Sequence, residues 1–101
     1  MMNNSILTKE HIENLVKQLL LKYHGESAIL FGSYARGDCT NNSDIDVIVY
    51  GGKDFRPFDI FAFGEDLREM TNKDADVFEI REVNQDSDFY KNVLNEGIRI
   101  S

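Results

Sequence analysis

Two short stretches decide the fold of this chain: Leu30-Phe-Gly-Ser-Tyr-Ala-Arg-Gly-Asp38 and Ser43-Asp-Ile-Asp-Val47. The first places a Gly-Ser pair directly after the apolar run of residues 27–31, whose length and composition are typical of a buried strand. The second opens another apolar run, residues 44–50, with an Asp-x-Asp pair. We therefore expect a turn that ends one strand and, after a polar loop, paired acids that open the next.

The aspartate pair has the spacing of a cation site. Residues two apart in a strand lie on one face, about 6.5–7 Å from each other at Cα, so Asp44 and Asp46 can aim at one point. Magnesium takes one or two carboxylates and leaves its other positions to water and phosphate. An interpretation without a functional role is also open, in which Asp44 caps a loop and Asp46 is a solvated strand residue. Against it, Asp46 shares a face with Ile48 while apolar residues line the other face, so a carboxylate there needs a partner.

The Gly-Ser pair has the features of a phosphate-binding turn. Gly32 lets a phosphate approach the backbone, and a helical turn over residues 34–36 would offer free amides at its start. The Ser33 hydroxyl adds a hydrogen-bond donor. Gly-Ser alone is an ordinary turn, and only its position beside the paired acids favours a nucleotide site.

The rest of the chain predicts helices that alternate with strands. Apolar residues at helical spacing between Ile12 and Tyr23 predict a first helix, with Thr8 as its N-cap and Gly25 as its C-cap. Pro57 stands where a second helix would begin, and residues 72–73 close it. The apolar stripe expected on that helix consists of Ile60, Phe63, Leu67 and Met70.

Residues 75–80 predict a third strand, residues 87–96 a last helix stopped by Gly97, and residues 98–100 a short edge strand. The order α-β-β-α-β-α predicts an α+β fold, with a small mixed or antiparallel sheet covered by helices. We expect residues 1–101 to form a single domain, because 101 residues suffice for one compact core.

Composition excludes several classes of protein. The formal net charge of −7 disfavours nucleic-acid binding and suits a protein that binds cations or a basic partner, although solubility alone would explain it equally well.

Residues 1–7 lack the features of a signal peptide, and no apolar run could span a bilayer. The one cysteine, Cys39, cannot form an internal disulfide, so we expect a cytoplasmic protein without a membrane partner. His11, His24 and Cys39 do not have zinc-ligand spacing.

The combined pattern resembles the minimal nucleotidyltransferases of the DNA polymerase beta superfamily. The resemblance rests on Gly32 and Ser33, a gap of ten residues, and then Asp44 and Asp46, together with the residues that surround these positions. It covers nearly the whole chain. The resemblance implies the polymerase beta-like fold, ATP as substrate and two Mg²⁺ ions. The two metal ions would lower the pKa of an acceptor hydroxyl and hold the triphosphate during an in-line displacement.

The resemblance also implies roles for individual residues. Asp44, Asp46 and a third carboxylate would be the catalytic metal ligands, and the best match for the third is Asp76, with Asp74 as the fallback. Glu79 falls on the opposite strand face from Asp76 and is excluded. Gly32 and Ser33 would hold the nucleotide phosphates. Arg36 could add positive charge there, although an arginine in such a turn is more often an ion-paired surface residue.

For partners, the resemblance implies a HEPN-domain toxin that the protein neutralises, as its antitoxin, by adding AMP to a tyrosine. Two alternatives are a catalytically inactive antitoxin that acts by binding and a nucleotidyltransferase for a small molecule; a homodimer is left open. Phe55, Phe58 and Phe61 fall away from the apolar stripe and could form an exposed docking patch, or they could be covered by other parts of the chain.

Overall fold

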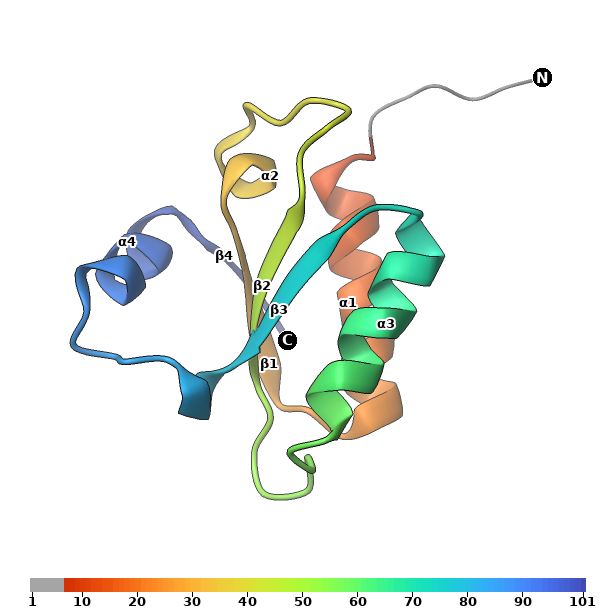
Figure 1. Cartoon of the computed structure of the whole chain (residues 1–101), viewed down its shortest axis with the longest axis vertical. Helices are drawn as coiled ribbons and strands as arrows, with labels where there is room; N and C mark the ends of the chain where they lie inside the picture. Colours follow the sequence, from red (N-terminus) through yellow and green to blue (C-terminus); the bar gives the residue numbers. More distant parts are fainter. Residues whose placement is uncertain (1–6) are drawn as a thin grey trace.

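The computed structural model describes residues 7–101. Its helices are α1 (Lys9–Tyr23), α2 (Ser33–Arg36), α3 (Asp59–Thr71) and α4 (Asp88–Glu96), with a 3-10 turn η1 (Ile80–Glu82). Its strands are β1 (Ser27–Phe31), β2 (Ile45–Tyr50), β3 (Ala75–Glu79) and β4 (Ile98–Ile100) (Figure 1). The predicted α+β class and order of elements are confirmed. No helix within the described residues has the length and apolar character needed to cross a membrane.

The four strands form one mixed sheet in the order β3-β2-β1-β4. Strand β1 runs antiparallel to both β2 and β4, whereas β2 and β3 are parallel. A parallel pair needs a crossover connection, and α3 supplies it between β2 and β3. As a result the last residues of β1 and the first residues of β2 and β3 lie at the same end of the sheet (Figure 1).

Helices cover both faces of the sheet: α1 and α3 lie on one face and α4 on the other (Figure 1). The larger core lies under α1 and α3, and a smaller core lies under α4. Alternate residues of β2 serve the two cores, so the predicted burial of this strand on both sides is confirmed. The smaller core contains Ile29, Ile48, Tyr90 and Val93.

Helix α1 ends one residue earlier than predicted. His24, not Gly25, is the C-cap: it adopts the left-handed conformation, with φ 63°, and its amide donates to the Leu20 carbonyl. The amide of Gly25 also donates to that carbonyl, at 2.9 Å. The glycine is needed for space instead, because a Cβ there would lie 2.8 Å from Leu20 Cδ2.

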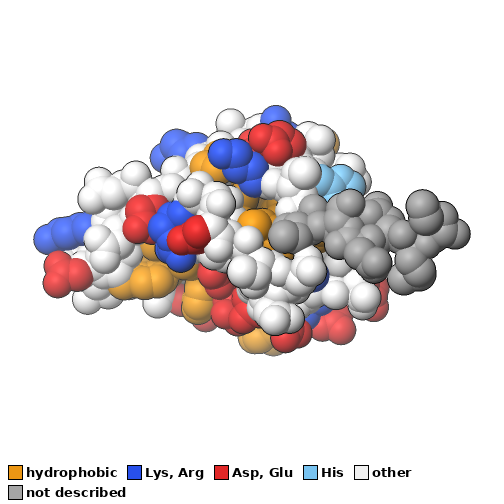
Figure 2. Space-filling view, turned by 90° about the horizontal axis from the view of Figure 1, so that it is seen from above, with side chains coloured by type: hydrophobic (Ala, Val, Ile, Leu, Met, Phe, Trp, Pro, Cys, Tyr) orange, Lys and Arg blue, Asp and Glu red, His pale blue; other side chains and the backbone are white. Residues whose placement is uncertain are grey.

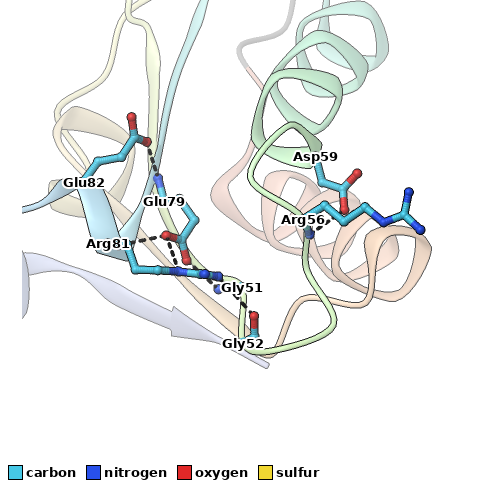
Figure 3. A network of polar contacts seen from close by, with 7 residues as sticks. All are labelled: Gly51, Gly52, Arg56, Asp59, Glu79, Arg81 and Glu82. Atoms are coloured by element: carbon cyan, nitrogen blue, oxygen red, sulfur yellow. Dashed lines mark hydrogen bonds and ion pairs between the residues drawn. The ribbon is translucent and has the colours of Figure 1, made fainter.

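Helix α3 begins at Asp59, two residues after Pro57, and the Asp59 carboxylate accepts a hydrogen bond from the Arg56 amide at 2.8 Å (Figure 3). The predicted stripe is wrong at its last position. Met70 is exposed, and Thr71 is buried in its place with its hydroxyl donating to the Leu67 carbonyl at 2.7 Å. With 3.6 residues per turn, the buried stripe continues at the fourth residue after Leu67 rather than at the third.

The predicted patch of three phenylalanines is wrong for Phe55. This residue lies in the loop before α3 and is buried in the larger core, where it packs against Gly51. Phe58 and Phe61 are exposed as predicted, at 80% and 71%. The exposed patch therefore has two phenylalanines, which we call the α3 patch.

Strand β3 ends at Glu79, one residue before the predicted end, because the Glu79 side chain turns the chain into η1. Its carboxylate accepts hydrogen bonds from the Arg81 amide at 2.8 Å and from the Gly51 amide at 3.2 Å, and it pairs with Arg81 Nε at 3.0 Å (Figure 3). The Glu79 amide in turn donates to the Glu82 carboxylate at 3.0 Å. Glu79 thus ties β3 to the loop after β2 and is buried.

Replacing Glu79 with Ala leaves the buried Gly51 amide without its acceptor and removes the ion pair. We expect the free energy of unfolding to fall by about 2–3 kcal/mol, measured by urea unfolding. Glu69→Ala is the control, since Glu69 is exposed on α3, and it should change stability by less than about 0.5 kcal/mol. Equal stability of the two variants would contradict this role of Glu79.

Candidate active site

The turn between β1 and α2 brings backbone against a carboxylate. Gly32 has φ 75° and ψ −154°, a conformation that a side chain disfavours, and a Cβ at this position would overlap Asp46 Oδ2. The Gly32 carbonyl accepts hydrogen bonds from the amides of Ala35 and Arg36, at 3.1 and 3.0 Å, which closes the first turn of α2. Only glycine allows the chain to turn this close to Asp46.

Helix α2 is held in place by Tyr34. Its ring is buried in the larger core. Ser33 precedes it in the chain and stays partly exposed beside the turn. The amides at a helix start have no intrahelical acceptor, so this turn presents donors and a hydroxyl to a ligand. The predicted helical turn over residues 34–36 is confirmed, and it begins one residue earlier, at Ser33.

The strand register lines up the acidic residues. Phe31 of β1 pairs with Asp46 of β2, and Asp46 pairs with Asp76 of β3. Residues in register on neighbouring strands point to the same face, so Asp46 and Asp76 lie side by side on the face that α4 covers. Asp44 is exposed and directly precedes β2 rather than opening it, as the sequence had predicted.

The charges of Asp44 and Asp76 act on Asp46, and we call these three residues the acid row. Burial first, and then the negative charges of Asp76 and Asp44, raise the pKa of the Asp46 carboxyl to about 6, although the positive charge of Arg36 lowers it. Asp76 and Asp44 are the acidic neighbours whose charges act on Asp46. A cation among these carboxylates would relieve the repulsion.

Within residues 7–101, no three His, Cys, Asp or Glu side chains are gathered closely enough to hold a metal ion. Asp44, Asp46 and Asp76 thus do not form a closed set of three ligands. Their chemistry nevertheless fits magnesium, which prefers carboxylate oxygens and needs only one or two from the protein. Burial is the main cause of the raised pKa of Asp46, and the neighbouring charges of Asp76 and Asp44 add to it where such an ion would bind.

Arg36 is ion-paired in this structure. Its guanidinium lies 3.3 Å from the carboxylates of Asp38 and of Glu96, and all three side chains are partly exposed. These two pairs raise the pKa of the guanidinium. The predicted role of Arg36 in phosphate binding stays a prediction, and it requires the side chain to leave or share these partners.

One feature beside the acids was missed in the sequence, a cluster of three phenylalanines that we call the aromatic cluster. The ring centroids of Phe31, Phe78 and Phe89 lie 5.6 to 6.4 Å apart. The sequence does contain a signal for Phe78, because this residue follows Asp76 by two positions and therefore lies on the same face of the strand. Phe89 could not be placed from sequence, since it comes from α4.

A glycine turn against the Asp46 carboxylate, with Asp76 in register beside it, is an arrangement that suits a transferase that uses nucleotides. The comparison with family models agrees. Residues 12–101 match the model described as polymerase beta, nucleotidyltransferase. The chain belongs to this nucleotidyltransferase family.

Two relatives from Methanocaldococcus jannaschii are named as candidate protein adenylyltransferases. One is 52% identical over 46 residues, which are 44% of this chain and 46% of the relative. The other is 35% identical over 66 residues, which are 65% of this chain and 71% of the relative. The match thus spans less than half the length of the first relative.

Solved structures share the fold. A toxin–antitoxin complex with AMP-PNP is 25% identical, with a TM-score of 0.73 over 86% of this chain and 70% of that one. A tri-AMPylated HEPN toxin of Shewanella oneidensis in complex with its MNT antitoxin gives 20% identity and a TM-score of 0.68, over 91% and 71% of the two chains. The second likeness establishes the fold alone.

Asp46→Asn tests the electrostatics of the acid row. The folded pKa of about 6 exceeds the unfolded value of 3.8, so ionisation of Asp46 costs stability above pH 6, and the cost disappears below about pH 4. We expect the Asn variant to be more stable than the wild type by about 1–2 kcal/mol at neutral pH, after allowance for solvent screening, and equally stable at about pH 4.

Urea unfolding at the two pH values measures this difference. Asp54→Asn is the matched control, because Asp54 is exposed in the loop after β2, and its effect on stability should not change with pH in the same way. A stability difference for Asp46→Asn that is the same at both pH values would contradict the raised pKa of Asp46, which burial and the neighbouring carboxylates cause together.

Proposed function

We propose that this protein transfers AMP from ATP to a tyrosine hydroxyl of a HEPN-domain toxin and thereby acts as its antitoxin. The observation that carries the proposal is the contact between the Gly32 turn and the Asp46 carboxylate, with Asp76 in register beside it. This contact supports the proposal because it brings a glycine turn close enough to the acids for both to contact one triphosphate. Family membership supports the reaction type.

In the proposed reaction, the Gly32–Ser33 turn binds the β and γ phosphates and orients the α phosphate over the acids. The acceptor oxygen forms a bond to the α phosphorus, the bond to the bridging oxygen breaks, and pyrophosphate leaves with the electron pair, while the hydroxyl proton is released. Asp44, Asp46 and Asp76 would hold the magnesium ions. Bound magnesium supplies charge neutralisation at the phosphates and a lower pKa for the acceptor hydroxyl.

The choice of AMP and of a protein acceptor rests on the relatives. The Methanocaldococcus relatives are named for protein adenylyl transfer, and the 25% identical toxin–antitoxin complex contains AMP-PNP. A HEPN partner is suggested by the Shewanella complex, whose toxin carries AMP groups. The net charge of −7 favours a protein acceptor over a nucleic acid.

The transfer is tested with labelled ATP, MgCl₂ and a HEPN-domain protein encoded beside this chain. We expect label on the partner, none after chelation with EDTA, and at least about a 100-fold lower rate for Asp46→Asn and Asp76→Asn. Asp74→Asn should keep most of the activity and serves as the matched control. A normal rate for Asp76→Asn with loss in Asp74→Asn would move the third carboxylate to Asp74.

Other outcomes discriminate between the functions. Tight binding of the partner without label on it would indicate an antitoxin that acts by binding alone. Label on a small hydroxyl compound, with none on the partner, would indicate a small-molecule nucleotidyltransferase.

The α3 patch is the proposed contact with the toxin. Because Phe61 is 71% exposed, Phe61→Asp should leave the melting temperature within about 3 °C and abolish complex formation in size-exclusion chromatography. Leu21→Asp on α1 is the control, as Leu21 is equally exposed, and it should still bind. Unfolding of the Phe61 variant, or normal binding by it, would contradict the assignment.

A further inference from the structure

The aromatic cluster exposes more apolar surface than the fold requires. Phe78 and Phe89 are 36% and 47% exposed, and Phe31 is partly buried beneath them. The Phe89 ring meets the rings of Phe31 and Phe78 edge to face, at interplanar angles of 82° and 74°. The rings therefore hold one another in a fixed arrangement while two of them still present surface to solvent.

The aromatic cluster directly adjoins the acid row. Phe31 pairs with Asp46 in the strand register, and Phe78 follows Asp76 on the same face of β3, about 6.5–7 Å away at Cα. Seen from the α2 end of the molecule, acidic side chains gather beside an apolar patch (Figure 2). The apolar surface of the aromatic cluster thus lies directly beside the carboxylates, on the same face of the sheet.

The geometry of the transfer decides what can occupy this apolar surface. In an in-line displacement, the attacking and leaving oxygens lie on opposite sides of the phosphorus. The turn proposed to hold the leaving pyrophosphate follows β1, on one side of Asp46, and β3 lies on its other side. The acceptor must therefore arrive over β3, where Phe78 is exposed.

We propose that Phe78 and Phe89 form the acceptor subsite and bind the aromatic ring of the acceptor tyrosine, with its hydroxyl toward Asp46 and Asp76. This inference rests on the proposed function. Tyrosine combines an apolar ring with a polar tip, which matches a wall of phenylalanine that ends in carboxylates. Serine and threonine are too short to contact Phe78 while their hydroxyls reach the acid row.

Charge specifies the surroundings of that tyrosine. Asp74 directly precedes β3, and Asp86 and Asp88 precede Phe89, all three exposed. These carboxylates repel an acidic segment and attract a basic one. The acceptor tyrosine is thus expected in a segment rich in lysine or arginine.

The test measures steady-state AMP transfer to the HEPN-domain partner by Phe78→Leu and Phe89→Leu. We expect the KM for the partner to rise about three- to tenfold in each variant, the range given by the loss of one aromatic contact, with the KM for ATP unchanged. Phe78→Tyr should restore the KM. Leu94→Ala is the control, because Leu94 is also exposed on α4 but is outside the aromatic cluster.

The outcomes separate this inference from the proposed function. No transfer by the wild type means that the proposed function itself has failed. Normal transfer by the wild type with an unchanged partner KM in both Leu variants would overturn the acceptor subsite alone. A raised KM for ATP instead would assign the aromatic cluster to binding of the nucleobase and would overturn the acceptor subsite. Equal labelling of a partner that carries serine in place of the acceptor tyrosine would also overturn the acceptor subsite.

Discussion

The register between β2 and β3 sets Asp46 beside Asp76, and the chemistry of the site depends on this placement of two like charges. Neither neighbouring strand supplies a basic group to balance them, and Arg36 is drawn toward Asp38 and Glu96. The fold thus keeps a negative charge that Arg36 compensates only in part, at one end of its strands. Such a site costs stability in the free protein, and a cation bound with its nucleotide would recover that cost.

The surrounding structure serves to maintain this placement. Gly32 brings backbone against Asp46, Tyr34 anchors α2 in the core, and Glu79 fixes the far end of β3 to the loop after β2. Gly32 and Tyr34 fix the turn beside Asp46, and Glu79 constrains the strand that carries Asp76. The division of the core by β2 has the same effect, because a strand packed on both faces cannot shift its register without exposing apolar residues.

Sequence predicted the parts of the site that lie close together in the chain. The order of turn, loop and strand around Gly32, Ser33 and Asp46 followed from the sequence, although Asp44 precedes β2 and the contact between Gly32 and Asp46 depends on the pairing of β1 with β2. Packing between distant segments was harder: Phe55 was placed on a surface because a loop residue has no periodicity that reports its burial. Phe89 was missed for a similar reason, as its neighbours Phe31 and Phe78 come from other elements. The pairing of Asp46 with Asp76 was inferred from family resemblance, because spacing cannot give the register between strands joined by a helix.

The crossover from β2 through α3 to β3 has a consequence for the newly made chain. Asp46 and Asp76 are thirty positions apart, and they meet only when the parallel pair has formed around a packed α3. Non-local pairing of this kind is slow compared with helix formation. During synthesis, a ribosome-bound fragment that ends before β3 would contain Gly32 and Asp46 but not Asp76. Competence for chemistry therefore arrives late, together with completion of the sheet.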